Sequence, residues 1–378
     1  MKVLFHSCVF YPSTGGVETI SRTMAEQMSQ MGHEVRIVTE TDLGAAQELE
    51  SERFSVIRKP TFKMRIKLVK QASIVFSNGA SMGLFFYAKL LGKPFVWTHN
   101  GYQVSCIDGL GWAYGEPSPL SPAASIAFHW RQSGPVRITL EAFKLFLRRS
   151  VSKGVDLNIA ATQWVAFRQP LPNQVQLYTP YELATFQNQK QENEVLDYDF
   201  VFVGRLVSEK GVRTLLKAFQ RIVRSHPDYC GRLLIVGDGP ERSNLERLAE
   251  ELGILSRTDF VGRKTGPELV RFIKKAPIAI VPSEWEEPMG GVALELLAAG
   301  RTLIVSKLGG MAECMGEAAL TFDNGNSESL QQCMELLVFD DELQEKLRSN
   351  AAQRLAAFSP HVLTARYIKE FERLVEGV

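Results

Sequence analysis

The chain has 378 residues, of which 45% are hydrophobic and 22% charged, a size and composition typical of a globular protein with two domains. Its five cysteines are scattered, odd in number and without a C-x-x-C pair, which argues against both a disulfide scaffold and a zinc site. No apolar run approaches the roughly 20 residues of a spanning helix, and the first strand begins without a signal peptide, so we expect a cytoplasmic location.

The net charge of +1 conceals an uneven distribution along the chain. Residues 1–180 contain 19 Lys and Arg against 12 Asp and Glu, whereas residues 181–378 contain 24 against 30. Within residues 53–153 the numbers are 15 and 3. So basic a region is expected to contact either an anionic acceptor or an anionic membrane, at the inner face of the plasma membrane. It lacks the interleaved aromatic residues of a nucleic-acid site, so no nucleic-acid partner is expected.

The first half alternates predicted strands and helices. Strands are predicted at 3–5, 35–39, 74–76, 94–97, 157–160 and 175–178, and helices from Glu18 to Met31 and at 136–150 and 162–168. Gly15 and Gly16 follow the first strand, at the edge where doubly wound sheets bind ligands. A plain tight turn explains these glycines equally well. Residues 187–198 are polar and predict an interdomain linker.

His99 and Asn100 follow the strand predicted at 94–97. At the carboxyl end of a strand, a histidine is expected to face a ligand crevice rather than the core, and a satisfied loop histidine is the alternative. Residues 58–70 predict a basic helix, which would either lie on a membrane interface or form the solvated face of a core helix. Residues 102–135 are rich in Gly, Pro and Ser and predict a long loop.

The second half repeats the pattern of strand, loop and helix, which predicts a second doubly wound domain. Strands are predicted at 199–203, 232–236, 259–261, 278–281 and 302–306, and helices at 212–225, 266–275, 327–338, 340–356 and 360–376. The last helix is long enough to reach back to the first domain. The D-x-D sequence at 197–199, which can bind metal in other proteins, precedes a strand, and a turn explains it better.

Two loops of the second half hold the strongest candidate site. Gly204, Arg205 and Lys210 follow its first strand, and the sequence EEPMGGVALELLAAG follows its fourth. Because the carboxyl ends of parallel strands share one edge, the two cations are expected to meet the helix that begins at Gly290-Gly291. A helix N-terminus with Arg and Lys beside it binds anions. Glu287 and Glu295 flank that helix end, and a carboxylate accepts hydrogen bonds from paired hydroxyls of a sugar.

These motifs resemble those of the retaining glycosyltransferases of family 4, which have the GT-B fold. The resemblance rests on the E-x7-E spacing of Glu287 and Glu295, on Gly204-Arg205 with Glu209-Lys210-Gly211, and on Gly237-Asp238-Gly239, Gly262-Arg263 and Gly15-Gly16-Val17-Glu18. It implies an α/β fold of two facing Rossmann-like domains with a crevice between them. The acceptor-binding domain would comprise residues 1–185 together with a C-terminal helix at 361–378 that crosses back to it, and the donor-binding domain residues 186–360.

The resemblance also implies roles for individual residues. Catalytic roles fall to Glu287, Arg205, Lys210 and His99, and acceptor contacts to Glu18 and Asn100. Donor contacts fall to Gly15, Gly16, Gly204, Arg263, Met289, Gly290, Gly291, Val292 and Glu295. Family members often have Phe where Met289 stands and a branched residue at Gly291, so the shape of the sugar pocket is expected to differ.

The implied reaction moves a hexose, with configuration retained by same-face attack, from a nucleotide sugar such as UDP-glucose to a saccharide or lipid-linked saccharide. Bacterial polysaccharide or glycolipid synthesis would be its setting, and no metal or other cofactor is expected. Two alternatives remain open at this point. One is a nucleotide-sugar epimerase of the same fold, which needs acid and base groups that residues 1–180 do not suggest. The other is a non-catalytic protein that binds sugar nucleotides.

Overall fold

The computed structural model describes residues 1–13, 15–44, 53–187 and 196–377, which fall into two compact units. The first unit comprises Met1–Gly111, Ser118–Glu182 and Ala357–Val378. The second comprises Trp112–Pro117 and Leu183–Ala356. Most of the linker expected at 187–198 lies outside the described residues.

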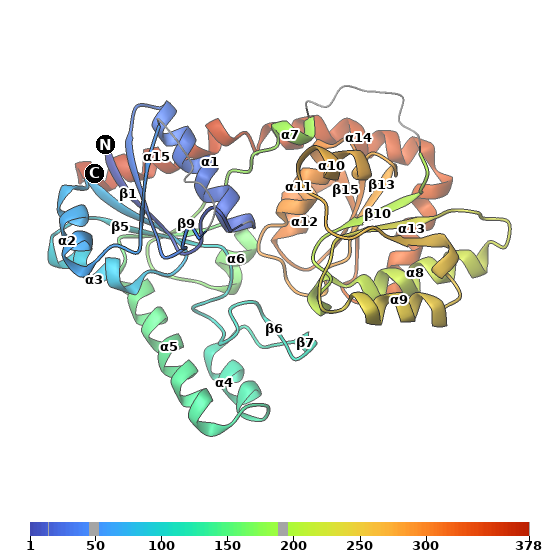
Figure 1. Ribbon diagram of the computed structural model, residues 1–378, viewed down its shortest axis with the longest axis horizontal. Helices are drawn as coiled ribbons and strands as arrows, with labels where there is room; N and C mark the ends of the chain where they lie inside the picture. Colours follow the sequence, from blue (N-terminus) through green and yellow to red (C-terminus); the bar gives the residue numbers. More distant parts are fainter. Residues whose placement is uncertain (14, 45–52, 188–195, 378) are drawn as a thin grey trace. The chain divides into compact units, whose positions relative to one another are not determined.

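The first unit is built on a seven-stranded sheet with the order β3-β2-β1-β4-β5-β8-β9 (Figure 1). Its strands are β1 (Lys2–Ser7), β2 (Glu34–Thr39), β3 (Ser55–Arg58), β4 (Ile74–Asn78), β5 (Phe95–His99), β8 (Leu157–Ala160) and β9 (Gln174–Gln176). Its helices are α1 (Gly16–Gln30), α2 (Phe62–Gln71), α3 (Met82–Leu90), α4 (Pro122–Trp130), α5 (Pro135–Gly154), α6 (Gln163–Arg168) and α15 (Pro360–Glu376). All strand pairs in this sheet are parallel.

Both faces of this sheet are covered, as its unbroken apolar strands predict. Alternate residues of β1 enter different clusters, with Val3 and Phe5 in one and Leu4 in the other. The C-terminal helix α15 contributes to the first cluster, where the rings of Phe76 and Phe371 lie 5.1 Å apart. The last helix of the chain therefore packs into the unit that contains the first strand.

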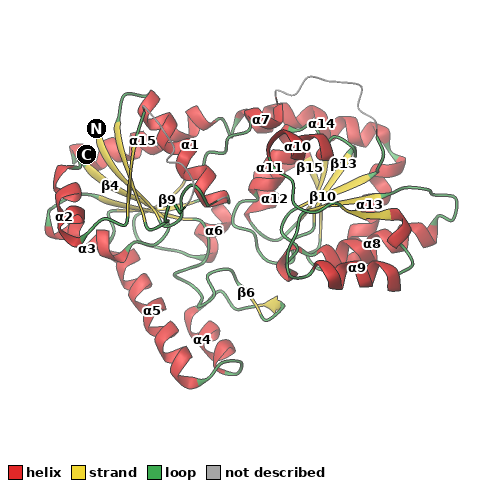
Figure 2. Ribbon diagram, in the orientation of Figure 1, coloured by secondary structure: helices red, strands yellow, loops and turns green. Residues whose placement is uncertain are grey.

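The second unit contains a six-stranded parallel sheet with the order β12-β11-β10-β13-β14-β15 (Figure 2). Its strands are β10 (Phe200–Val203), β11 (Leu233–Val236), β12 (Thr258–Phe260), β13 (Ile278–Val281), β14 (Thr302–Ser306) and β15 (Ala319–Phe322). Its helices are α7 (Ala184–Gln187), α8 (Val212–Ser225), α9 (Arg242–Glu251), α10 (Gly266–Ile273), α11 (Gly291–Ala298), α12 (Gly310–Met315), α13 (Ser327–Phe339) and α14 (Asp341–Ala356). The 3-10 turns are Ser208–Lys210, Leu255–Arg257 and Gly316–Ala318.

The prediction of a loop over 102–135 was wrong in part. This segment contains α4 and the two-stranded hairpin of β6 (Trp112–Ala113) and β7 (Glu116–Pro117). A buried carboxylate organises it, because Asp108 Oδ2 accepts hydrogen bonds from Ser118 Oγ at 2.6 Å and from His129 Nε2 at 3.0 Å. Burial would raise the pKa of Asp108, but the hydrogen bonds that it accepts hold the pKa below its usual value.

The basic helix expected at 58–70 is α2, which is preceded by the unpredicted strand β3. Leu68 and Val69 are buried in the core of the first unit, while Lys63, Lys67 and Lys70 are exposed. This packing favours the solvated face of a core helix over an interfacial helix. No helix among the described residues is long and apolar enough to span a bilayer.

Candidate functional site

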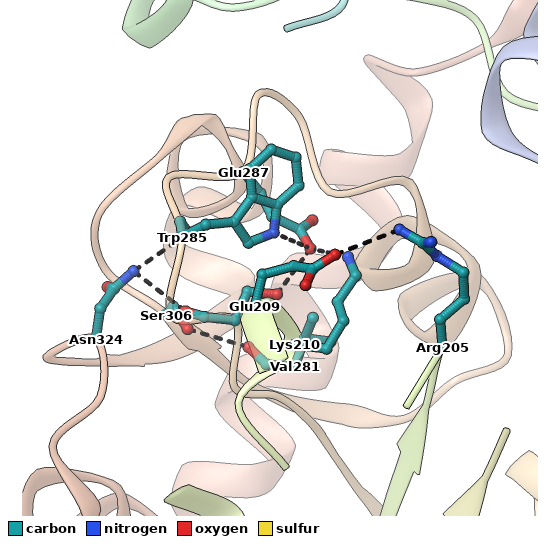
Figure 3. Close-up of polar contacts among 9 residues, drawn as sticks. Arg205, Glu209, Lys210, Val281, Trp285, Glu287, Ser306 and Asn324 are labelled. Atoms are coloured by element: carbon teal, nitrogen blue, oxygen red, sulfur yellow. Dashed lines mark hydrogen bonds and ion pairs between the residues drawn. The ribbon is translucent and has the colours of Figure 1, made fainter. Parts of the chain in front are cut away.

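The two candidate loops meet at one edge of the second sheet. They follow β10 and β13, which are parallel neighbours in that sheet. The backbone joins them, because the N–H of Glu284 donates to the carbonyl of Glu209 at 2.9 Å. The expected meeting of the loop that carries Lys210 with the loop before Gly290-Gly291 is therefore confirmed, and it brings Lys210 to Glu287, 77 positions away in sequence (Figure 3).

Lys210 and Glu287 form a buried ion pair, with side-chain exposures of 18% and 7%. The ammonium group donates to Oε1 of the carboxylate, which also accepts from Ser283 Oγ at 2.7 Å and from Trp285 Nε1 at 3.3 Å. All three bonds reach the same oxygen (Figure 3). The second oxygen, Oε2, receives none of them and remains an acceptor for a ligand hydroxyl.

The charge state of Glu287 follows from these contacts. Burial would raise the pKa of Glu287, but the Lys210 charge and the hydrogen bonds from Lys210, Ser283 and Trp285 outweigh that effect and lower it. Glu287 is therefore an anion at neutral pH, able to accept hydrogen bonds at either oxygen.

Glycines shape both loops at the points where a helix begins. Gly211, with φ at +68°, precedes α8, and a Cβ there would lie 1.8 Å from the carbonyl oxygen of Pro282. Gly290, with φ at +82°, precedes α11, and a Cβ there would lie 2.5 Å from Cγ of Met311. Both positions require glycine. The N–H groups of Ala293 and Leu294 donate to the carbonyl of Gly290, and the N–H groups before them belong to the helix end that can bind an anion.

Arg205 is the more accessible of the two cations, with a side-chain exposure of 73%. Its Nη2 lies 3.5 Å from Oε1 of Glu209, which holds it beside the same loop (Figure 3). The neighbouring Glu284 is more constrained than its place in a polar run predicts, because its carboxylate accepts from Thr214 Oγ1 at 2.6 Å. Glu284 thus fastens the loop to α8.

Glu295 lies half-buried on the second turn of α11, and Glu287 lies in the loop before this helix. Burial raises the pKa of Glu295 from 4.5 to about 7, and no hydrogen bond or charge in the described structure opposes that shift. A carboxylate that is partly desolvated and lacks a donor is suited to bind paired hydroxyls, because they would supply the missing hydrogen bonds.

Apart from Gly15 and Gly16, the other expected donor residues lie in the second unit. Gly204 directly follows β10, and the exposed Arg263 comes three residues after β12. Gly291 and Val292 form the first turn of α11. Met289 is 4% exposed, so it supports the loop from inside.

The expected residues of the first unit are less open than the sequence suggested. The prediction that His99 faces a crevice was wrong, because its ring is 3% exposed and stacks on Trp97 with the centroids 4.7 Å apart. Asn158 donates both amide protons to backbone carbonyls, so its Oδ1 accepts from His99 Nε2 at 2.8 Å. Burial lowers the pKa of His99 to about 4, although the bond to Asn158 opposes this. Asn100 donates to the side chain of Asn78.

The glycine turn before α1 is closed by Glu18, whose carboxylate accepts from Ser13 Oγ at 2.6 Å. Gly15 and Gly16 are exposed at this turn. The bond from Ser13 gives Glu18 a local role in shaping the turn. The acceptor contacts of Glu18 and Asn100, the donor contacts of Gly15 and Gly16, and the catalytic role of His99 remain predictions.

Asn324 is a site residue that the sequence did not reveal. Its Nδ2 lies 3.1 Å from the carbonyl of Ser283 (Figure 3). Its Oδ1 accepts from the N–H of Leu308 at 2.9 Å. The carbonyl of Trp285 is 3.5 Å away. Asn324 lies 37 residues beyond Glu287, after a strand that was not predicted, so no local pattern pointed to it.

We expect Asn324→Ala to slow the reaction of this site by about tenfold or more, because the loop that carries Ser283, Trp285 and Glu287 would lose its support. The free energy of unfolding should fall by only about 1 kcal/mol. Rates and urea denaturation curves measure the two effects. The control is Asn350→Ala, which removes an amide on α14 that donates to the carbonyl of Glu317 at 2.9 Å and bonds to neither loop. Equal rates in the two variants would contradict the role of Asn324.

Within the part of the chain that the structure describes, no group of three or more His, Cys, Asp or Glu residues could hold a metal ion. The polar groups gathered around the two loops are cations, carboxylates and helix-end N–H groups. Such a set suits a ligand with both phosphate and hydroxyl groups.

Two family models match the chain. The model described as glycosyl transferases group 1 matches residues 184–354, and the model described as glycosyltransferase family 4 matches residues 14–168. Between them they match most of both units.

Curated relatives share mainly one half of the chain. A D-inositol 3-phosphate glycosyltransferase of Corynebacterium glutamicum is 32% identical over 194 residues, which are 49% of this chain and 46% of the relative. A glycogen synthase of Mycobacterium tuberculosis is 36% identical over 165 residues, 42% of this chain and 38% of the relative. The chain spans less than half the length of these curated relatives.

Solved structures match over the whole chain. The structure of HepE from Anabaena in complex with UDP and glucose is 17% identical and has a TM-score of 0.73, covering 98% of this chain and 99% of HepE. The sucrose-phosphate synthase of Thermosynechococcus elongatus is 18% identical with a TM-score of 0.74, over 100% of both chains. At such identities the likeness concerns the fold, which is GT-B. The two family models, which match residues 14–168 and 184–354, show that the chain belongs to the family 4 glycosyltransferases.

Proposed function

We propose that this chain is a retaining glycosyltransferase that moves a hexose from a nucleoside diphosphate sugar to a hydroxyl of a saccharide or lipid-linked saccharide. The observation that carries the proposal is the ion pair of Lys210 and Glu287, in which all three hydrogen bonds reach Oε1 and none of them reaches Oε2, just before the N-terminus of α11. The pair combines a charge for phosphate with an acceptor for sugar hydroxyls. UDP-glucose is the proposed donor, supported by the likeness to HepE, which was solved with UDP and glucose.

Each donor group has a matching group in the second unit. The diphosphate would bind Arg205, Lys210 and the first N–H groups of α11. Oε2 of Glu287 would accept from hydroxyls of the sugar, and Glu295 from the ribose diol. The base would meet the backbone at Arg263.

In the transfer step, the bond between the anomeric carbon and the diphosphate oxygen breaks while the acceptor oxygen bonds to that carbon from the same face. The acceptor proton passes to the departing phosphate oxygen. Negative charge grows on the diphosphate, so fixed cations and helix-end N–H groups stabilise the transition state. The protein supplies position and charge, and no residue needs to form a covalent intermediate.

A thermal-shift screen of UDP, ADP, GDP and their glucose conjugates tests the donor. The matching nucleotide, present at 100 times its Kd, should stabilise the protein by about 2.7 kcal/mol. NMR of the product should then show the anomeric configuration of the donor. An inverted product would contradict the retaining mechanism, and an activity that requires Mn²⁺ and is abolished by EDTA would contradict metal independence.

The same assay separates the alternatives. An epimerase would convert the donor sugar without an acceptor, which NMR of the donor alone would reveal. A binding protein would give a thermal shift with no turnover on any acceptor.

A further inference from the structure

Helix α5 of the first unit is apolar on two opposite faces. Its inner face is buried, with Ile138 and Leu145 at 2% and 1% exposure. Its outer face is open to solvent and carries four large apolar residues: Val136, Leu140, Phe143 and Phe146. Their exposures are 75%, 57%, 57% and 65%, and their spacing of three or four residues places them along one side of the helix.

A further large apolar residue, Trp130, ends the neighbouring helix α4 and is 54% exposed. Figure 1 shows α5 leading away from the first sheet, with α4 beside its far part. Large apolar side chains gathered on one exposed surface mark a site of association, because water solvates them poorly.

The charges around this face indicate the kind of partner. Residues 121–154 contain six Lys or Arg and a single acid, Glu141, which pairs with Lys144 at 2.9 Å. Arg131 and Arg137 are exposed next to the apolar residues. A second copy of the chain would bring two basic segments together, and their repulsion opposes self-association through this face. An anionic surface attracts the cations and accepts the apolar side chains.

We propose that the outer face of α5 docks on an anionic lipid bilayer. Leu140, Phe143 and their apolar neighbours would enter the boundary between headgroups and acyl chains, while Arg131 and Arg137 bind lipid phosphates. This surface differs from α2, whose apolar residues Leu68 and Val69 are used in the core. Docking goes beyond sugar transfer, and it would place the protein beside lipid-linked acceptors.

Vesicle sedimentation of the full chain tests the proposal. Vesicles of phosphatidylcholine with phosphatidylglycerol should bind the protein, more weakly at high salt, and vesicles of phosphatidylcholine alone should bind it poorly. In the double variant Leu140→Gln with Phe143→Gln, the affinity for anionic vesicles should fall by about tenfold or more. Both residues are exposed, so its melting temperature should match the wild type.

A matched control is Leu336→Gln on α13, because Leu336 is 51% exposed on the second unit and should not affect binding. Unchanged binding of the double variant, or no binding of the wild type to anionic vesicles, would overturn the proposal. The proposal would also be overturned if light scattering showed a dimeric wild type and a monomeric double variant, and neither protein bound lipid. The readout requires no turnover, so failure here leaves the proposed transfer reaction intact.

Discussion

Lys210→Ala is expected to lower kcat for sugar transfer by about 10²–10³-fold. The ammonium group lies at the edge where the diphosphate would depart, and its field is strong because the side chain is only 18% exposed. Arg205, at 73% exposure, is more solvated and cannot replace it. Steady-state rates with saturating donor and acceptor measure the loss.

The same substitution also affects stability, because Glu287 would lose its counter-charge. In the wild type, the lowered pKa of Glu287 means that the pair stabilises the fold above about pH 4.5, and that this contribution is lost as the pH falls through the lowered value. Removal of the lysine should lower the free energy of unfolding at pH 7 by about 3 kcal/mol. Urea denaturation measures this change.

The double variant Lys210→Ala with Glu287→Gln separates the two effects. With both charges removed, no buried carboxylate is left unpaired, so much of the lost stability should return. Activity should stay low, because neither the cation for the phosphate nor the carboxylate for the sugar is present. If transfer recovers with stability, the pair is only structural and the phosphate assignment is wrong.

Much of the second unit follows from local patterns in the sequence. The strand at 278–281, the helix at 212–225 and the strand at 302–306 have the predicted bounds, because short apolar runs end at Gly, Pro or Ser. β3 and β15 were missed, since polar or exposed residues interrupt both strands and neither forms a continuous apolar run. In the segment 102–135, the buried Asp108 supplies order through side-chain bonds that composition does not reveal.

The site was predictable where it depends on strand ends. Arg205, Lys210 and Glu287 were placed correctly, because loops after neighbouring parallel strands meet at one edge. The supports of Glu287 were not, since Ser283 and Trp285 are ordinary loop residues until their bonds to Oε1 are seen. For His99 the position at a strand end was predicted correctly, but the orientation of its ring was not. The ring is held by a hydrogen bond to Asn158, which the position in the sequence does not reveal.

The Glu295 carboxylate destabilises the free protein at neutral pH, because its pKa is raised to about 7 from 4.5. Below pH 4.5 the group is protonated in both the folded and the unfolded state and carries no penalty. As the pH rises from 4.5 through 7, the unfolded state loses the proton of Glu295 first, and the folded state must then hold a poorly solvated anion. The free energy of unfolding therefore falls over this range. Glu295→Gln should therefore raise the free energy of unfolding by about 1–3 kcal/mol at pH 8 and little at pH 5, as urea denaturation would show.

The same variant should bind UDP about 10- to 100-fold more weakly, because an amide offers one acceptor oxygen where the carboxylate offers two charged ones.

In the wild type, the ribose diol would favour the carboxylate form, so calorimetry should show tighter binding as the pH rises from 6 to 8, with a proton released. The phosphate of UDP titrates in the same pH range and also contributes to the pH dependence of binding. The Glu295→Gln variant keeps the contribution of the phosphate and loses the contribution of the carboxyl group. Glu250→Gln removes an exposed acid from α9 and serves as the control, with neither effect expected. A variant that is stabler at pH 8 but binds UDP as the wild type does would show that Glu295 is not the ribose ligand. If Glu295 binds the ribose, Glu295→Gln should gain stability and lose affinity for UDP together. A carboxylate that is poorly solvated in the free protein costs stability and binds the ligand through the same side chain.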